Sequence, residues 1–196
     1  MRLRTFLAGL ATAAASVTAL TAVQPASAAN GVPRLSHVVV VVMENHSYSE
    51  IIGSSSAPYI NSLANSGAKM TQSFAVTHPS EPNYLALFSG STQGITDDSC
   101  PHSFSTANLG RQLINAGATF KGYSESMPSD GYTGCTSGTY ARKHNPWVNF
   151  TNVPSTSNLR FTDFPTTYSN LPTVSFVVPT SATTCTTAAS RPATAG

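Results

Sequence analysis

Residues 35–43 read Leu-Ser-His-Val-Val-Val-Val-Val-Met, and this stretch decides the fold class that the sequence predicts. A continuous β-branched run is typical of a strand that is buried on both faces in the centre of a parallel sheet. An amphipathic edge strand would alternate apolar and polar residues instead. We therefore expect 35–43 to be a buried central strand.

Helical and extended patterns alternate along the rest of the chain. One helix is expected at 57–67, with Pro58 near its start and Gly67 at its end. Further helices are expected at 82–89 and 109–116, strands at 69–76, 119–123 and 173–178, and a long loop at 126–139. This alternation predicts an α/β fold with a mostly parallel sheet flanked by helices. In such sheets the functional site lies beyond the carboxyl ends of the strands.

The first 28 residues have the pattern of a secretory signal peptide. Arg2 and Arg4 precede a small-residue apolar stretch at 6–23, and Ala-Ser-Ala at 26–28 is a cleavage signal. A membrane anchor is the weaker interpretation, because the stretch is rich in Ala and Thr and lacks positive charges after it. We expect a secreted, extracellular protein that begins at Ala29 and has no stable membrane anchor.

Charge and cysteine content indicate which partners and which disulfide the sequence favours. The chain has ten Lys and Arg against eight Asp and Glu, and the numbers become equal once Arg2 and Arg4 are removed. Bulk charge therefore favours neither nucleic acid nor an acidic membrane as a partner. Cys100 and Cys135 are plausible disulfide partners, although the sequence leaves open whether they are bonded. That pairing would leave Cys185 as a third, unpaired cysteine.

Two motifs carry candidate chemistry. Glu44 and Asn45 directly follow the first strand, and their side-chain oxygens suit a divalent metal ion, although Asn45 could simply cap a turn. Ser80 stands at the start of a helix, where its hydroxyl would lie beside free backbone N–H groups and a phosphate could bind. A plain helix cap is the alternative there. Asp97 and Asp98 are explained by a turn and are not assigned to the site.

Taken together, the motifs resemble the bacterial phosphoesterase family, which includes acid phosphatases and phospholipase C-type enzymes, within the alkaline-phosphatase-like superfamily. Its small secreted acid-phosphatase branch includes proteins called phosphatidylinositol-3-phosphatases. The matching stretches are 37–48, 57–67, 77–90, 140–150 and 171–179. They span nearly all of the chain from Ala29 to Pro179, in the family order.

The resemblance implies a role for each matching residue. Glu44 and Asn45 match the first metal ligands, and Ser80 matches the nucleophile that forms a phosphoseryl intermediate. Asn83 matches a residue that can hold a phosphate oxygen. A divalent metal at Glu44 and Asn45 would lower the pKa of the Ser80 hydroxyl. Lys143 and His144 are expected near the phosphate or the leaving group, with a solvated cation and a structural histidine as the alternatives.

The sequence departs from the family after Pro179. The family continues there with acidic residues that complete the metal site, whereas residues 180–196 contain no acidic residue. Read one base out of frame, the Thr, Ser and Ala codons of this tail are compatible with the family's continuation. We therefore expect a single-base deletion near the codon of Pro179; a natural low-complexity tail is the alternative.

The expected organisation is a signal peptide at 1–28, the N-terminal part of a phosphoesterase domain at 29–179, and an aberrant tail at 180–196. The expected function is a secreted phosphoric-ester hydrolase that acts on a small phosphorylated substrate, either a phosphomonoester or a phospholipid head group. Its metal site would be incomplete and its sheet would lack the later strands, so we expect little turnover and poor stability. A non-catalytic remnant that binds phosphate and a secreted adhesion or carbohydrate-binding module are the alternatives.

Overall fold

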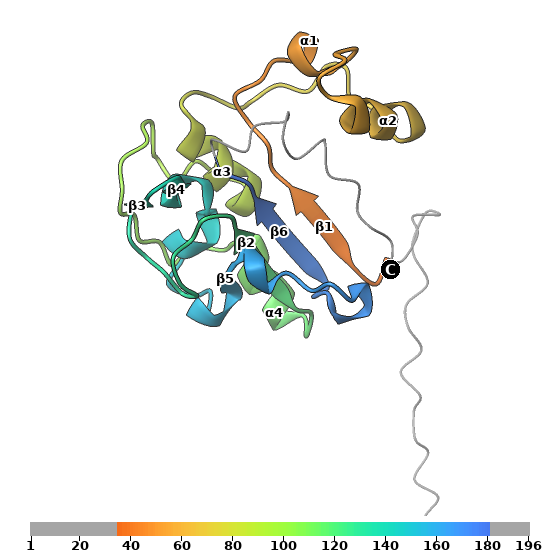
Figure 1. Ribbon diagram of the computed structural model, residues 1–196. Helices are drawn as coiled ribbons and strands as arrows, with labels where there is room; N and C mark the ends of the chain where they lie inside the picture. Colours follow the sequence, from red (N-terminus) through yellow and green to blue (C-terminus); the bar gives the residue numbers. More distant parts are fainter. Residues whose placement is uncertain (1–34, 181–196) are drawn as a thin grey trace, which may run out of the picture. The chain divides into compact units, whose positions relative to one another are not determined.

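The computed structural model describes residues 35–180. The expected signal peptide, Cys185 and all of the expected tail except Thr180 therefore lie outside the described residues. Residues 35–180 form an open α/β arrangement around one sheet (Figure 1). Among them, no helix has the length and apolar character needed to span a membrane.

The sheet has four parallel strands, which confirms the predicted fold class. These are β1 (Val38–Val41), β2 (Phe120–Ser124), β5 (Asn158–Arg160) and β6 (Val174–Val178), in the order β1-β6-β2-β5. Val39 pairs with Ser175, and Tyr123 pairs with Val177 on one side and Leu159 on the other. Strand β5 has only three residues and was not predicted.

The position predicted for the valine run is wrong. Within residues 35–180, β1 pairs with β6 alone and forms an edge of the sheet. Val38, Val39 and Val41 are 38%, 40% and 49% exposed. The central place belongs to β6, where Phe176, Val177 and Val178 are buried. A β-branched run specifies extended backbone, but the number of neighbouring strands depends on contacts far away in the sequence.

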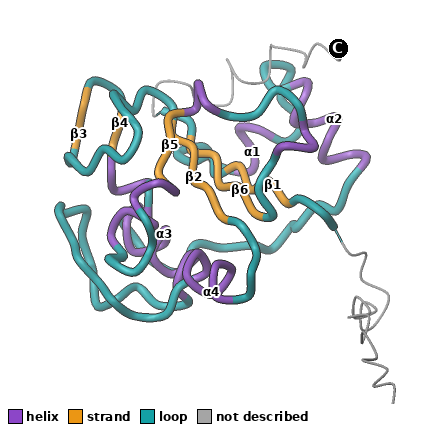
Figure 2. Tube along the Cα trace, turned by 90° about the horizontal axis from the view of Figure 1, so that it is seen from below, coloured by secondary structure: helices purple, strands orange, loops and turns teal. Residues whose placement is uncertain are grey.

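The predicted helices are present with small shifts of their ends. They are α2 (Pro58–Ser66), α3 (Ser80–Ser89) and α4 (Leu109–Asn115); a short α1 (Tyr48–Ile51) was not predicted. Gly90 ends α3 in the left-handed region at φ 73°, a conformation that glycine adopts without steric cost. Helices α3 and α4 lie together on one face of the sheet (Figure 2).

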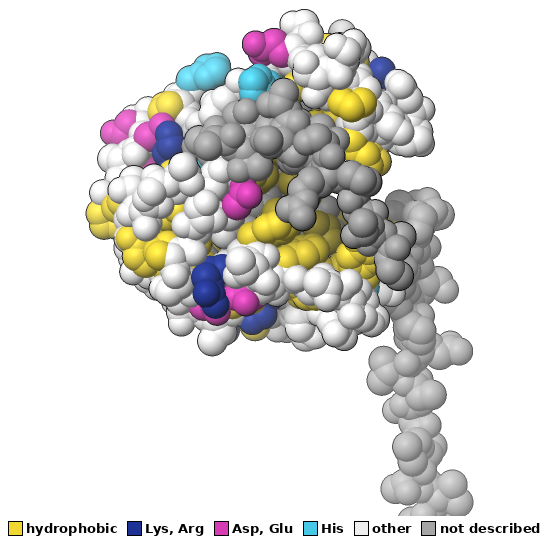
Figure 3. All heavy atoms as spheres, in the orientation of Figure 1, with side chains coloured by type: hydrophobic (Ala, Val, Ile, Leu, Met, Phe, Trp, Pro, Cys, Tyr) yellow, Lys and Arg dark blue, Asp and Glu magenta, His cyan; other side chains and the backbone are white. Residues whose placement is uncertain are grey.

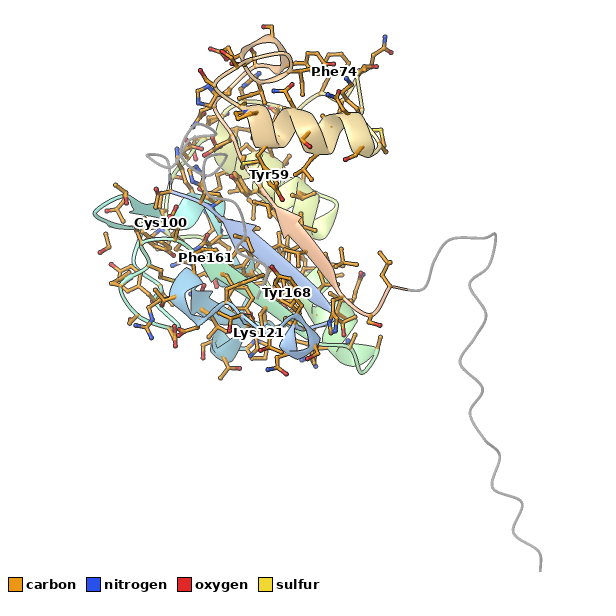
Figure 4. All side chains as sticks on the ribbon, turned by 45° about the vertical axis from the view of Figure 1, so that its right-hand side comes forward. Tyr59, Phe74, Cys100, Lys121, Phe161 and Tyr168 are labelled. Atoms are coloured by element: carbon orange, nitrogen blue, oxygen red, sulfur yellow. A yellow bond between two sulfur atoms is a disulfide. The ribbon has the colours of Figure 1, made fainter. Side chains whose placement is uncertain are left out.

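The strand predicted at 69–76 does not form. This stretch is a loop of turns and bends, and its apolar side chains Met70, Phe74 and Val76 are strongly exposed. Phe74 lies on the loop beside α2 in Figure 4. An extended segment becomes a strand only when a neighbouring strand accepts its hydrogen bonds, and no partner is present among the described residues.

Aromatic rings fill the core between α3 and the sheet. Phe88 lies at its centre, with ring centroids 5.3 to 6.4 Å from those of Phe120, Trp147, Phe150 and Phe176. Gly122 of β2 lets the Trp147 indole lie directly on the strand, because a Cβ there would overlap the ring. The core thereby fixes α3, through Phe88 in its last turn, against residues 146–150.

Irregular segments connect the remaining elements. The loop predicted at 126–139 contains β3 (Thr136–Ser137), which pairs antiparallel with β4 (Tyr140–Ala141). Short 3-10 helices follow at Arg142–His144, Pro146–Asn149, Ser155–Ser157, Phe161–Asp163 and Tyr168–Asn170. The first of these carries Lys143 and His144 toward the start of α3.

Candidate active site

Three segments meet at the start of α3. Glu44 follows the carboxyl end of β1, Ser80 is the first residue of α3, and His144 ends the 3-10 helix Arg142–His144. The Ser80 hydroxyl donates a hydrogen bond of 2.9 Å to Oε2 of Glu44. Nε2 of His144 lies 2.5 Å from the other carboxylate oxygen, Oε1. One carboxylate thus joins a serine and a histidine.

The Glu44–His144 contact is short but is not a well-aligned hydrogen bond. Oε1 and Nε2 are both buried, and neither makes a hydrogen bond of regular geometry within the described residues. Burial by itself raises the pKa of Glu44, but His144, the Ser80 hydroxyl and the charge of Lys143 together bring that pKa below its ordinary value. Glu44 is therefore a carboxylate over most of the physiological pH range.

His144 is held from its face as well as its edge. Its ring stacks on Tyr84 of α3, with centroids 5.1 Å apart and an interplanar angle of 27°. Tyr84 lies one helical turn after Ser80, so α3 presents the hydroxyl and the stacking ring on the same side. The buried imidazole is consequently fixed in position relative to Ser80.

A hollow of about 490 Å³ opens beside these residues. Glu44, Asn45, Ser80, Asn83 and Tyr84 contribute to its wall. A volume of this size accommodates a small phosphorylated molecule. The sequence-predicted residues Glu44, Asn45, Ser80 and Asn83 are therefore brought to one place.

Asn83 makes hydrogen bonds to the loop that precedes α3. Its Oδ1 accepts from the backbone N–H groups of Val76 and Thr77, and its Nδ2 donates to the carbonyl oxygens of Thr77 and Pro79. The amide thereby shapes the backbone that leads into Ser80. Its expected contact with a phosphate oxygen stays a prediction.

The N-terminus of α3 is already occupied by a carboxylate of the chain itself. Oδ1 of Asp98 accepts a hydrogen bond of 2.9 Å from the backbone N–H of Glu81, and Pro82 has no N–H to offer. Oδ2 of Asp98 lies 2.7 Å from Nζ of Lys143. The free N–H groups expected beside Ser80 are thus partly used. Sequence reasoning assigned Asp98 to a turn, and no local pattern signals these distant contacts.

Glu81, the residue that follows Ser80 in α3, has a buried carboxyl group. Its Oε1 accepts a hydrogen bond of 3.1 Å from Asn149, whose own Oδ1 accepts from Arg142. His102 lies 3.8 Å from Oε2. Burial raises the pKa of Glu81 to about 7, against the partial compensation from Asn149. Sequence reasoning missed this residue also.

The donors present fit a divalent metal ion in kind but not in number. Glu44 and Asn45 offer the carboxylate and amide oxygens that hard cations prefer. However, both oxygens of Glu44 already face groups of the chain, and Asn45 is exposed with φ 67°. No group of three or more His, Cys, Asp or Glu side chains within residues 35–180 forms a metal-binding cluster.

A disulfide joins the loop that follows Asp98 to the segment that precedes Arg142. Cys100 and Cys135 are bonded, with Cα atoms 5.8 Å apart, as the sequence had suggested. Cys135 also accepts a backbone hydrogen bond of 2.9 Å from Arg142. The loop that carries Asp98 is thereby tied to the segment that carries Lys143 and His144. Cys100 is labelled in Figure 4.

Comparison with protein families gives a match to the "Phosphoesterase family" over residues 54–190. The chain is 56% identical over 155 residues to a phosphatidylinositol-3-phosphatase of Mycobacterium tuberculosis. The aligned residues make up 78% of this chain and 52% of that protein. It is 33% identical over 157 residues to a probable acid phosphatase of Kluyveromyces lactis, covering 71% and 36%. An acid phosphatase of Aspergillus fumigatus is 36% identical over 135 residues, covering 60% and 30%.

The chain therefore spans about half the length of the first of these relatives and about a third of the other two. No solved structure matches it.

Proposed function

The chain belongs to the phosphoesterase family, and from this premise we propose that it is a phosphoric-ester hydrolase with Ser80 as its nucleophile. The observation that carries the proposal is the hydrogen bond from the Ser80 hydroxyl to Glu44 at the wall of a hollow of substrate size. A serine whose hydroxyl faces a carboxylate has an acceptor for its proton when the oxygen attacks.

The proposed reaction has two displacements at phosphorus. Oγ of Ser80 attacks the phosphorus, its proton passes along the hydrogen bond to Glu44, and the ester oxygen leaves with its bonding electrons and takes a proton from water. Water then attacks the phosphoserine and gives a proton to the hydroxide left by the first step, while Oγ leaves and recovers its proton from Glu44. Inorganic phosphate is released and the serine is regenerated.

His144 has a supporting role in this proposal. Its contact with Oε1 orients the carboxylate so that Oε2 faces Ser80, and the stacked Tyr84 ring keeps the imidazole in place. A fixed carboxylate keeps the hydroxyl in one rotamer, which reduces the reorganisation needed for attack. Asn83 supports the same geometry through the backbone of residues 76–79.

A divalent metal ion is a separate proposal for the same carboxylate: with Glu44 and Asn45 as ligands, Glu44 would hold the ion instead of taking the serine proton. Such an ion would supply positive charge that lowers the pKa of the serine hydroxyl and offsets charge on the phosphate.

The substrate class follows from the relatives, whose names are phosphatidylinositol-3-phosphatase and acid phosphatase. We propose a phosphomonoester or the phosphorylated head group of a phospholipid as the substrate, hydrolysed outside the cell. The Cys100–Cys135 disulfide supports the location, since disulfides persist in oxidising compartments.

A second candidate is a protein that binds phosphate without turnover. The observation that favours it is the lack of a three-residue metal cluster among residues 35–180. Both candidates place the phosphate at Ser80, but only the hydrolase depends on the serine oxygen as a nucleophile.

The test is hydrolysis of p-nitrophenyl phosphate by the purified chain, with Ser80→Ala, with a chelator, and with Ser66→Ala as the matched control. Ser66 lies on exposed α2 and its hydroxyl bonds only carbonyl groups of its own helix among the described residues. Turnover that Ser80→Ala abolishes and Ser66→Ala leaves unchanged supports the hydrolase. Inorganic phosphate binding without any turnover favours the second candidate, and neither binding nor turnover contradicts both.

A further inference from the structure

We infer that Asp98 is a positioning residue, which holds the ammonium group of Lys143 beside the Ser80 end of α3 so that this cation meets the substrate phosphate. The inference rests on the proposed function, because it places the phosphate at Ser80. Nothing in the family comparison assigns a role to Asp98.

The contacts of Asp98 are long-range. Its Oδ1 accepts from the N–H of Glu81, which is 17 residues away in the sequence, and its Oδ2 lies 2.7 Å from Nζ of Lys143, 45 residues away. One carboxylate therefore joins the residue after Ser80 to the residue before His144. The pair is half-buried: the two side chains are 31% and 30% exposed.

The neighbouring Asp97 shows what a turn residue does in the same loop. Asp97 is exposed, and its Oδ1 accepts from the backbone N–H and the hydroxyl of Ser99, two residues further on. These bonds close the turn. The two oxygens of Asp98 instead contact the backbone N–H of Glu81 and the ammonium group of Lys143.

Lys143 is held by Asp98 in the same part of the structure as Glu44 and His144. Its positive charge helps to lower the pKa of the Glu44 carboxyl group, and its neighbour His144 contacts that group directly. The 3-10 helix Arg142–His144 therefore directs its last two side chains to two carboxylates, Lys143 to Asp98 and His144 to Glu44. In Figure 3 a basic side chain lies next to acidic ones at the surface above β4.

The surrounding structure fixes both partners of the pair. The Cys100–Cys135 disulfide begins two residues after Asp98, and Arg142, directly before Lys143, donates to the carbonyl oxygen of Cys135. Half-exposed ion pairs contribute little to stability by themselves. Such rigid support for a weakly stabilising pair is expected when the position of the cation matters for a ligand.

Electrostatics alone and positioning predict opposite results for Asp98→Asn. Removing a negative charge near an anion site should tighten phosphate binding if Asp98 is only a nearby charge. If Asp98 positions Lys143, its removal lets the flexible lysine side chain leave the site, and binding weakens despite the additional net positive charge.

The experiment measures the affinity of the purified chain for inorganic phosphate by calorimetry, in Asp98→Asn, Lys143→Ala, the double variant and Asp98→Glu. Asp97→Asn, in the same turn, is the matched control. We expect Lys143→Ala to weaken binding about tenfold and Asp98→Asn about fivefold, with no further loss in the double variant compared with Lys143→Ala. Asp98→Glu should restore part of the loss, and Asp97→Asn should leave the affinity unchanged.

Unchanged or tighter binding by Asp98→Asn would overturn the inference while the proposed function stands. Equal losses from Asp98→Asn with and without Lys143 would also overturn it, because Asp98 would then act independently of the lysine. Absence of phosphate binding by the unmodified chain would contradict the proposed function and this inference together.

Discussion

The hydroxyl of Ser80 lies 2.9 Å from Oε2 of Glu44, although 36 residues separate the two in the sequence. The contact forms because β1 ends at the same edge of the sheet at which α3 begins. His144 occupies the second oxygen of the same carboxylate. The arrangement directs one carboxylate oxygen at the serine and keeps the other from competing for it.

Replacing Glu44 by Gln tests this division of the carboxylate. The amide keeps an oxygen for the Ser80 hydroxyl but loses the negative charge that His144 faces. We expect the rate of p-nitrophenyl phosphate hydrolysis to fall about a hundredfold, the usual scale for loss of a proton acceptor. Glu50→Gln is the control, since Glu50 is exposed and its contacts among the described residues are local ones, to Ser47 at the start of α1 and to His46. Equal rates for both variants would contradict the role of Glu44.

The buried carboxyl group of Glu81 predicts a pH-dependent stability. Its pKa is raised from 4.5 to about 7, mainly by burial, so the folded state binds its proton more tightly than the unfolded state does. The resulting stabilisation is complete below pH 4.5 and is lost as the pH rises through about 7. It amounts to at most about 3 kcal/mol.

Thermal melts of the chain and of Glu81→Gln between pH 4 and 8 check this prediction. The melting temperature of the chain should decline relative to that of the variant as the pH increases. Nε2 of His102 lies 3.8 Å from Oε2 of Glu81, so the comparison is repeated in a His102→Gln background. Parallel pH profiles in both backgrounds would show that Glu81 does not change its protonation on folding.

The disulfide between Cys100 and Cys135 closes a segment with a sequence separation of 35. Its loss in the Cys100→Ser/Cys135→Ser double variant should lower the free energy of unfolding by about 3–4 kcal/mol, because the unfolded chain gains entropy. Urea denaturation measures the change. A reducing agent should reproduce the loss in the unmodified chain and have no effect on the double variant, and a reductant effect on the double variant would contradict the assignment.

Two features show how much of the structure could be predicted from the sequence: the pair Glu44 and Ser80, and the valine run. Glu44 and Ser80, which the structure brings into contact, were expected at one site because each stands at a strong local signal, the end of a β-branched run or the start of a helix. The valine run itself was placed in the centre of the sheet, yet it lies at an edge (Figure 3 shows hydrophobic side chains at the surface near β1). Strand position depends on partners far along the chain, which no local pattern encodes.

Asp98 and Glu81 were missed for the same reason. Asp98 stands in a Thr-Asp-Asp-Ser sequence that a turn explains, and only the folded chain brings it to Lys143. Glu81 stands in the first turn of a helix, where an acidic residue is ordinary. Its burial results from the packing of residues 142–149, which lie more than 60 residues later.

The last prediction concerns metal binding. Only Glu44 and Asn45 are expected ligands within residues 35–180, and such ions require about four to eight ligands. We therefore expect the chain to bind a divalent cation weakly, on the order of millimolar, and to hydrolyse p-nitrophenyl phosphate slowly even when the ion is added. Calorimetric titration with Mg²⁺ and Zn²⁺ measures the affinity, with Glu44→Gln as the control. Submicromolar binding that Glu44→Gln removes would show that the described ligands suffice.

Weak binding that becomes tight when the reading frame is restored after the codon of Pro179 would support the expected single-base deletion. Sequencing of the gene at that codon tests the deletion directly.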